Sequence, residues 1–182
     1  MGLSRGNSKL PTTTGIFNLP AVQTCSNCLE CQEFCYALKA ERMYTNVLPS
    51  RMSNWRDSLG QLFVNKTVLR ILKLNVDTIR IHESGEFFSQ AYFLKWVSIA
   101  KQLPGIQFYA YTKAMNIDFS MRPANLRIIA SVPGDFGLDG TALVVKDKTV
   151  KLKGFFTCQG NCKVCSYCNK SKGFIKVAFP LH

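Results

Sequence analysis

The cysteines are the feature that most constrains how this chain can fold. They form two groups: an N-terminal quartet of Cys25, Cys28, Cys31 and Cys35, and a C-terminal quartet of Cys158, Cys162, Cys165 and Cys168. The N-terminal quartet has gaps of two, two and three residues, and the C-terminal quartet repeats these gaps in reverse order. All eight cysteines belong to one quartet or the other, so we expect both quartets to bind metal.

The spacing also indicates which metal to expect. A C-x2-C-x2-C-x3-C run is the ligand run of bacterial cluster ferredoxins. Zinc sites usually take their thiolates as two C-x2-C pairs that lie a dozen or more residues apart. We therefore expect one or two iron–sulfur clusters of the 4Fe-4S type, with zinc as the alternative. The division of the thiolates between clusters stays open. Each quartet could bind one cluster, the quartets could exchange their fourth ligands, or both quartets could share one cluster.

Structural disulfides are a further interpretation, because an even number of cysteines is typical of small secreted proteins. The first six residues show no apolar segment of a secretory signal, and a chain of 182 residues does not need disulfides to fold. No apolar run reaches the roughly 18 residues of a membrane span. We expect a reducing, cytoplasmic setting without membrane contact.

The chain is basic, with a formal net charge of +12 from 23 basic and 11 acidic residues. Each four-thiolate centre would carry about two negative charges, so two of them would leave roughly +8. That excess still attracts polyanions, which makes nucleic acid a candidate partner beside a host protein. The lysines concentrate near the C-terminus, at Lys146, Lys148, Lys151, Lys153, Lys163, Lys170, Lys172 and Lys176.

Three helices are expected in the first half of the chain. Residues 36–44 are rich in helix formers, Ser50 is a typical N-cap for a helix to about residue 63, and residues 65–74 predict one or two further turns. The apolar spacing predicts that the second and third helices bury Met52, Trp55, Leu59, Leu62, Phe63, Val68, Leu69, Ile71 and Leu72.

Alternating residues predict strands at 76–82, 107–112 and 126–132, with further strands at 141–146, 150–157 and 173–179. Ser89 is a typical N-cap for a helix that Pro104 and Gly105 end. Strand, helix and strand in this order imply parallel pairing through a right-handed crossover. The fold class is therefore α/β, with an open or partly closed parallel sheet that forms an incomplete barrel.

We expect one domain over residues 1–182. It would have an extended lead-in at 1–24, the two quartets at 25–35 and 158–168, and an α/β body at 76–156. The N- and C-terminal cysteine segments together would form one metal-binding region. Metal affinity becomes folding energy when the ligands come from distant segments.

A candidate pocket lies at the carboxyl ends of the expected strands, where ligands of parallel sheets collect. His82, Glu83 and Glu86 follow one strand, and Lys113 follows the next. A histidine beside two carboxylates can carry protons or line a ligand site. The alternative is a hydrogen-bonded structural histidine, with Glu86 capping the next helix.

The chain resembles an uncharacterised family of bacteriophage proteins, the gene product 88 family. The matching residues are 6–9, 31–40, 80–87, 108–113 and the C-terminal quartet. The resemblance implies a phage or prophage origin, and hence the cytoplasm of a host cell.

A more distant resemblance is to radical S-adenosylmethionine enzymes, which build parallel α/β barrels and bind a cubane through three cysteines. Cys158, Cys162 and Cys165 match that spacing. The stretch Ser84, Gly85 and Glu86 is similar to the glycine-glycine-glutamate stretch that holds the cofactor's amine in those enzymes, which marks these three as candidate cofactor-binding residues. The departures are the C-terminal place of the triplet and a fourth thiol at Cys168, which would occupy the iron that stays open in those enzymes.

Three functions follow as hypotheses. The first is a phage iron–sulfur protein with a redox or binding role, acting on nucleic acid or a host protein. The second is a zinc-stabilised nucleic-acid-binding protein, and the third is a minimal radical S-adenosylmethionine-like enzyme.

Overall fold

The computed structural model describes residues 2–25, 32–33, 35–134 and 136–181. The strands within these residues are β1 (Ser4–Arg5), β2 (Thr14–Phe17), β3 (Thr78–Ile81), β4 (Gln107–Thr112), β5 (Leu126–Ala130), β6 (Gly140–Val145), β7 (Phe156–Thr157) and β8 (Ile175–Pro180). The helices are α1 (Tyr36–Met43), α2 (Val47–Leu59), α3 (Phe63–Leu74), α4 (Gln90–Gln102) and α5 (Tyr167–Lys170).

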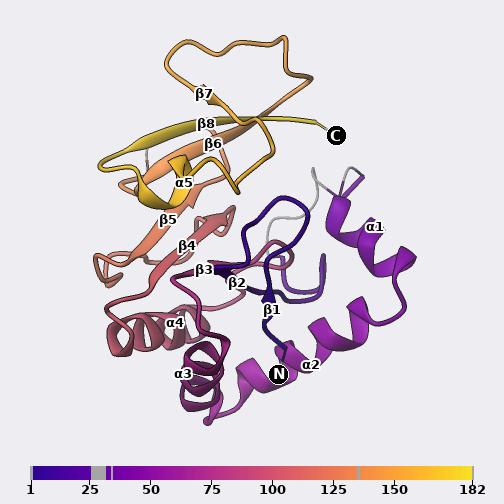
Figure 1. Cartoon of the computed structure of the whole chain (residues 1–182), viewed down its shortest axis with the longest axis vertical. Helices are drawn as coiled ribbons and strands as arrows, with labels where there is room; N and C mark the ends of the chain where they lie inside the picture. The colour runs from indigo at the N-terminus through magenta and orange to yellow at the C-terminus, as the bar shows by residue number, and fades with distance from the viewer. Residues whose placement is uncertain (1, 26–31, 34, 135, 182) are drawn as a thin grey trace.

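The described strands form one open sheet in the order β1-β2-β3-β4-β5-β6-β8-β7. β1 pairs antiparallel with β2, and every other pair is parallel. Because β1 and β7 lie at opposite edges, the sheet does not close (Figure 1). The expected mixed α/β class with an open sheet is confirmed.

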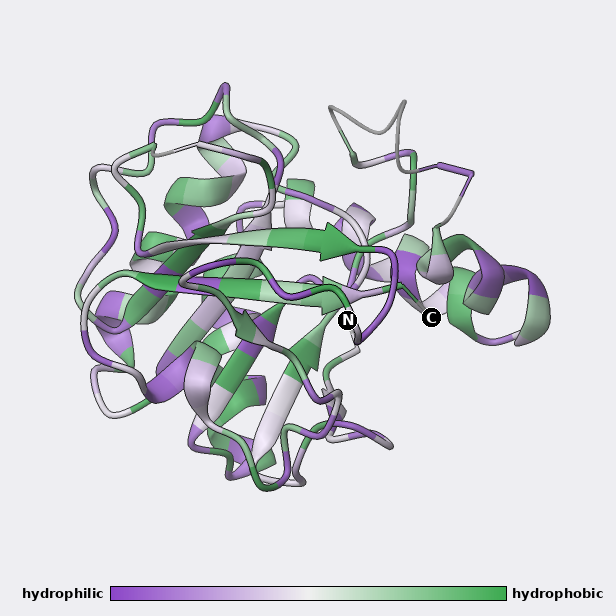
Figure 2. Cartoon of the chain, turned by 90° about the horizontal axis from the view of Figure 1, so that it is seen from above, coloured by the Kyte–Doolittle hydropathy of each residue, from purple (hydrophilic) through white to green (hydrophobic). Residues whose placement is uncertain are grey.

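One face of the sheet carries the main apolar core. Ile79 and Ile81 of β3 and Phe108 of β4 are fully buried there, together with Phe93 and Trp96 of α4. In a β-strand, every second side chain lies on the same face of the sheet, as Ile79 and Ile81 do here. Figure 1 shows α3 and α4 beside the β2–β4 part of the sheet, and Figure 2 shows the strands mostly in the colour of hydrophobic residues.

The other face is polar and aromatic in its central strands. Arg80 pairs with Tyr109 in register, and Tyr109 pairs with Arg127, so these three residues form a row across β3, β4 and β5. Toward β8, a second apolar cluster forms around Ile129 and Val177, and Tyr111, Tyr167 and Cys168 pack against it. The C-terminal cysteine segment therefore covers this face.

Several elements agree closely with the sequence. α1, α4 and β4 are confirmed, and the Ser89 hydroxyl caps α4 by accepting the Tyr92 N–H at 3.2 Å. The strand expected at 150–157 is present only as the two residues of β7. Residues 1–24, expected as a lead-in, also supply β1 and β2, and β2 is a fully buried strand that pairs parallel with β3.

The prediction that the apolar residues in and beside α2 and α3 are buried is wrong for four leucines. Leu59, Leu62, Leu69 and Leu72 are about 60% exposed, and α2 instead buries Arg51, Asn54 and Ser58.

Polar contacts explain this difference. Asn54 exchanges hydrogen bonds with the Gly2 backbone and donates to the Asn18 carbonyl at 2.9 Å, while Arg51 donates to the Ala37 carbonyl and to Glu41. Buried polar groups that find such partners can replace an apolar face.

Among the described residues, no helix combines the length and apolar character that a membrane crossing requires.

Candidate functional site

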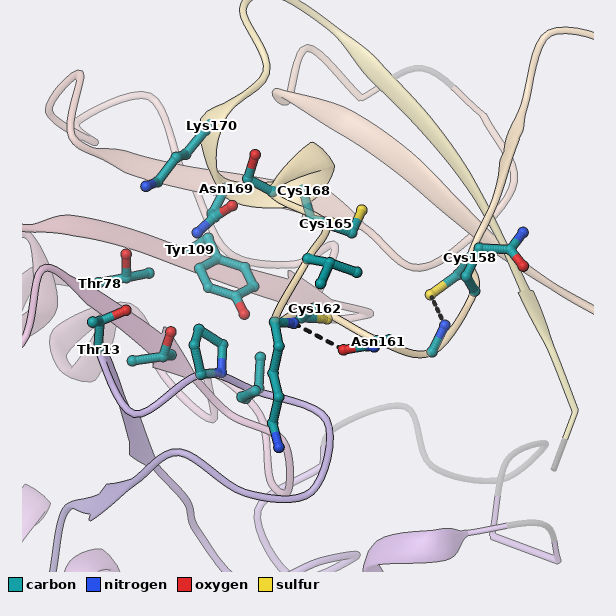
Figure 3. A pocket seen from close by; sticks show the side chains of 18 of the residues that line it. Thr13, Thr78, Tyr109, Cys158, Asn161, Cys162, Cys165, Cys168, Asn169 and Lys170 are labelled. Carbon is teal, nitrogen blue, oxygen red and sulfur yellow. Dashed lines mark hydrogen bonds between the residues drawn. The ribbon is translucent and has the colours of Figure 1, made fainter.

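A cavity of about 420 Å³ lies between the polar face of the sheet and the C-terminal cysteine segment. All four thiols of the C-terminal quartet line this cavity: Cys158, Cys162, Cys165 and Cys168. Tyr109 of β4 and residues around Thr13 and Thr78 line its other side (Figure 3). The quartet therefore gathers around a single space.

Backbone contacts hold the cysteine segment against the sheet. The Cys158 N–H donates to the Ala178 carbonyl at 2.8 Å, which extends the pairing of β7 with β8. The Cys162 N–H donates to the Lys9 carbonyl at 2.9 Å, so the N-terminal segment supports the middle of the loop.

Side chains fix the remaining end, at α5. Arg127 of β5 donates to the carbonyls of Cys168, Ser171 and Gly173. Tyr167 of α5 stacks on Phe156 of β7, with ring centroids 4.5 Å apart. These contacts place Cys168 over the sheet.

Cys35 and the four cysteines of the C-terminal quartet are free thiols. Burial raises the pKa of Cys168 to about 11 and also raises the pKa of Cys162, so both thiols are protonated at neutral pH in the chain without metal. The Gly160 N–H donates to the Cys158 sulfur at 3.4 Å, a contact that would also stabilise a thiolate there.

The thiols line the cavity without converging on one point. Within the described part of the chain, no three Cys, His, Asp or Glu side chains are grouped closely enough to hold a metal ion. The expected metal-binding region is therefore represented by a shared cavity, and not by a formed coordination sphere.

The N-terminal quartet is described only at its two ends. Cys28 and Cys31 lie outside the described residues. Cys35 is the N-cap of α1, where its sulfur accepts the Leu38 N–H at 3.4 Å. Cys25 follows a turn after β2, in which its N–H donates to the Val22 carbonyl at 3.1 Å.

The carboxyl end of β3 has a buried histidine. His82 is 4% exposed, its Nε2 lies 2.9 Å from the Tyr92 hydroxyl, and its backbone is left-handed at φ 64°. Burial lowers the pKa of His82 to about 3, so the imidazole is neutral at pH 7.

Glu86 is buried as well and links two strand ends. Its carboxylate accepts the N–H groups of Lys113 at 2.6 Å and Phe87 at 3.0 Å and the Thr112 hydroxyl at 2.8 Å. Burial raises the pKa of Glu86, although these three hydrogen bonds oppose the rise. Glu83 is only half-buried and accepts two hydrogen bonds from Asn7. The structure brings the Glu86 side chain to the Lys113 backbone, and the catalytic use of His82, Glu83, Glu86 and Lys113 stays a prediction.

Ser84 and Gly85 form a close turn against residues that precede the N-terminal quartet. The Ser84 hydroxyl donates to the Leu19 carbonyl at 2.8 Å. Gly85 has φ 84°, and a Cβ there would lie 2.5 Å from the Cβ of Leu19 and 2.7 Å from the Thr24 hydroxyl oxygen. Packing alone thus requires glycine at this position, and cofactor binding by these residues stays a prediction.

Arg80 and Tyr109 were not predicted as site residues, because the alternation of a strand is enough to explain Tyr109 in the sequence. Both lie on the sheet face that the cysteine segment covers, and Tyr109 is 4% exposed. The signal was present in the alternation of Arg80 with the apolar residues Ile79 and Ile81, because a charged residue within a buried strand has to face a special environment.

The comparisons with known proteins identify a family and no activity. The model of the family described as Gene product 88 matches residues 1–152, so the match ends before the C-terminal quartet. The Gene 88 protein of Mycobacterium phage L5 is 28% identical over 137 residues, which cover 67% of this chain and 56% of that protein. The Gene 88 protein of Mycobacterium phage D29 is 29% identical over 95 residues, which cover 46% of this chain and 39% of that protein.

No solved structure matches this chain. The resemblance to radical S-adenosylmethionine enzymes therefore finds no support, and the sheet is open where those enzymes build a barrel. The matches to the curated phage proteins cover between two fifths and somewhat over half of their length. Because the family match extends over most of the chain, the chain belongs to the Gene product 88 family of phage proteins.

Proposed function

We propose that this phage protein binds an iron–sulfur cluster through its C-terminal quartet. The observation that carries the proposal is that all four thiols of the quartet line one cavity of about 420 Å³. Thiolates are the ligands that iron–sulfur clusters require. When bound, such a cluster would supply one-electron chemistry or a rigid, metal-stabilised surface.

The same donors could bind zinc, and the spacing of the quartet supports a cluster. Structural zinc sites usually take their thiolates as two C-x2-C pairs that lie a dozen or more residues apart. The quartet instead has the gaps of a cluster-ligand run in reverse order, within the single segment 158–168.

The loop that carries the quartet can adjust to a bound group. Cys162 and Cys165 lie between β7 and α5, outside any strand or helix, and Cys158 directly follows β7. Binding would remove the thiol protons, and its free energy would then add to the stability of the folded chain.

Analysis of oxygen-free preparations tests this proposal. We expect brown protein that contains iron and acid-labile sulfide in equal amounts. Cys162→Ala should lose most of both, whereas Ser166→Ala, a change in the same loop at an exposed hydroxyl, should keep them. Colourless protein with stoichiometric zinc would contradict the cluster, and full metal content in Cys162→Ala would contradict the quartet as ligands.

Nucleic-acid binding is a second candidate function, and it rests on the charge of the C-terminal segment. Residues 140–181 contain eight lysines and one acidic residue, Asp147, which amounts to 8 − 1 = +7 of the total of +12. All eight lysines are exposed, and none forms an ion pair within the described residues. Phe156 and Phe174 are 36% and 46% exposed in the same segment, and bases can stack on such rings.

Fluorescence anisotropy with a single-stranded 20-nucleotide DNA tests this second function. We expect affinity to fall steeply between 50 and 200 mM salt, because lysine–phosphate contacts release counterions. Lys172→Gln with Lys176→Gln should weaken binding at least threefold. Lys73→Gln with Lys101→Gln removes the same charge from exposed positions on α3 and α4 and should have little effect. Equal losses in both double variants would indicate only a general charge effect.

A further inference from the structure

Arg80 is a largely buried cation whose one ion pair among the described residues, with Glu83, is long at 3.9 Å. It lies in the middle of β3, between Ile79 and Ile81, which are fully buried in the main core. Its side chain therefore extends from the opposite face, beneath the C-terminal cysteine segment, and is only 19% exposed. Removing a guanidinium from water is costly unless paired groups replace the water.

The contacts of Arg80 do not meet that cost. Its guanidinium lies over the rings of Tyr109 and Tyr111, 5.9 and 5.4 Å from their centroids. A carboxylate oxygen of Glu83 is 3.9 Å from Nη1, and the buried Nε has no hydrogen-bond partner among the described residues. In the part of the chain that the structure describes, Arg80 donates no hydrogen bond, although a guanidinium has five N–H donors.

Arg127 provides the contrast within the same sheet. It lies on the same row, two strands away, and donates to three backbone carbonyls. The fold can therefore satisfy a guanidinium on this face. Within the described residues, the lack of hydrogen bonds from the guanidinium is therefore specific to the position of Arg80.

Tyrosine rings separate Arg80 from the C-terminal quartet. The Tyr109 ring, over which Arg80 lies, lines the cavity together with the four cysteines. The Tyr111 ring, which also contacts Arg80, packs against the same apolar cluster as Cys168. Tyr36, which follows Cys35 of the N-terminal quartet, donates its hydroxyl hydrogen to the carbonyl of Glu83, whose carboxylate forms the one ion pair of Arg80 among the described residues. Arg80 is thus one side chain away from the cavity of the C-terminal quartet.

We propose that Arg80 is the counter-ion of a metal–thiolate centre on the C-terminal quartet, and that it sets how strongly the centre binds. This inference rests on the proposed metal binding and assigns to Arg80 the role of a positioning residue. A centre with four thiolates carries about two negative charges, whichever of iron–sulfur or zinc is bound. Ligation would place negative charge in the cavity that the Tyr109 ring separates from Arg80.

A soluble anion such as phosphate is the competing partner, and the geometry favours the thiolates. Tyr109 lines the cavity and packs over Arg80, whereas Arg80 itself is not among the residues that line the cavity. A dissolved anion would need to reach the guanidinium for paired hydrogen bonds. Negative charge on the cysteines that line the cavity would act on Arg80 without direct contact, because charge–charge attraction extends beyond the first layer of side chains.

Co²⁺ titration of the metal-free full-length chain tests the proposal. The thiolate-to-cobalt absorption band reports binding, and the proteins compared are the wild type, Arg80→Gln, Arg80→Lys and Arg70→Gln. Arg70 is exposed on α3, so its change removes the same charge far from the quartet. We expect about 10- to 100-fold weaker Co²⁺ binding for Arg80→Gln, in the range of changes next to metal ligands. Arg80→Lys should recover most of the affinity, and Arg70→Gln should stay within twofold of the wild type.

A stability measurement separates this role from a merely structural one. If Arg80 lacks a partner without metal, metal-free Arg80→Gln should resist urea at least as well as the metal-free wild type. A purely structural arginine predicts a clear loss. Arg80→Met, which keeps the length of the side chain, replaces the Gln variant if that variant does not fold.

The outcomes distinguish the two proposals. A wild type that binds no Co²⁺ would overturn the metal proposal itself. A wild type that binds Co²⁺ with an unchanged affinity in Arg80→Gln would overturn only the role of Arg80. Stabilisation of the metal-free wild type by inorganic phosphate, lost in Arg80→Gln while Co²⁺ affinity is unchanged, would assign Arg80 to a soluble anion and also overturn it.

Discussion

His82 shows how packing, and not sequence type, decides the chemistry of a residue. Its ring packs against Phe87 and Tyr92, with centroids 4.9 and 5.7 Å away, and burial lowers its pKa to about 3. An unfolded chain protonates histidine near pH 6.5. As the pH falls below 6.5, the unfolded state therefore binds a proton that the folded state does not bind until about pH 3. The free energy of unfolding decreases as a result.

We predict that this difference lowers the free energy of unfolding by about 2 kcal/mol between pH 6.5 and 5. Urea denaturation of the wild type and His82→Asn across this range provides the measurement. Asparagine tolerates the left-handed backbone and does not titrate, so the variant should show a flatter profile. Identical pH profiles for the two proteins would contradict a buried neutral imidazole.

Glu86 gives a second prediction for a single residue. Its two carboxylate oxygens accept three hydrogen bonds, from Phe87, Thr112 and Lys113. Glu86→Gln replaces one acceptor by an amide donor, which should cost about 1–3 kcal/mol of stability in thermal or urea unfolding. Glu33→Gln, at an exposed position, should change stability by less than about 0.5 kcal/mol. If Glu86→Gln left the stability of the chain unchanged, these hydrogen bonds would be dispensable for the fold.

The sequence located these residues but not their environments. The alternation of residues 76–82 predicted a strand, and His82 indeed lies at its end. Its burial depends on aromatic rings from the next loop and helix, which a single-sequence pattern cannot place. The same holds for Arg80, which lies beside the Tyr109 ring only because β3 and β4 pair in this register.

Among the elements, the pairing of β6 with β8 depends on a close approach at Gly140. A Cβ at this position would lie 2.5 Å from both the carbonyl oxygen and Cγ1 of Ile175. The backbone oxygen cannot move without breaking the pairing of the two strands. We predict that Gly140→Ala destabilises the chain by about 1–3 kcal/mol in urea unfolding.

Gly105→Ala is the matched control, because a Cβ there meets nothing within 4 Å. It should change stability by less than about 0.5 kcal/mol. If Gly140→Ala were equally harmless, β6 and β8 would not approach each other as closely as the structure has them.

The helices show where periodicity succeeds and fails as a predictor. α4 was predictable from its N-cap at Ser89 and from its apolar side, which packs on the sheet. α2 was not, because Arg51 and Asn54 are buried by hydrogen bonds to segments distant in sequence, while Leu59 faces outward. A pattern of apolar residues contains no information on such partners.

At the scale of the whole molecule, the order of most strands in the sheet follows the chain, which is why the α/β class was predictable. β2 was missed because four residues of mixed type give too short a pattern, and β7 is shorter still. The cavity was not foreseeable either. It requires the residues around Thr13 and Thr78 to meet a segment that begins at Phe156, far later in the chain.

Metal binding should tie this late segment to the rest of the molecule. We predict that amides of residues 158–170 exchange hydrogen much faster in the metal-free chain than in the metal-loaded chain, since the ligand loop is held there by few backbone contacts. Amides of β4 should exchange slowly in both forms, because β4 pairs with a strand on each side, β3 and β5. Hydrogen-exchange mass spectrometry measures both, and equal protection of residues 158–170 in the two forms would contradict ligation by the quartet.

X-ray absorption at the metal edge of protein purified without oxygen tests the central claim most directly. Ligation by the C-terminal quartet predicts a first shell made of sulfur at about 2.3 Å, together with an iron–iron shell if the centre is a cluster. The shell should be lost in Cys162→Ala and kept in Ser166→Ala. A first shell made only of oxygen and nitrogen, or purified protein without bound metal, would contradict the claim.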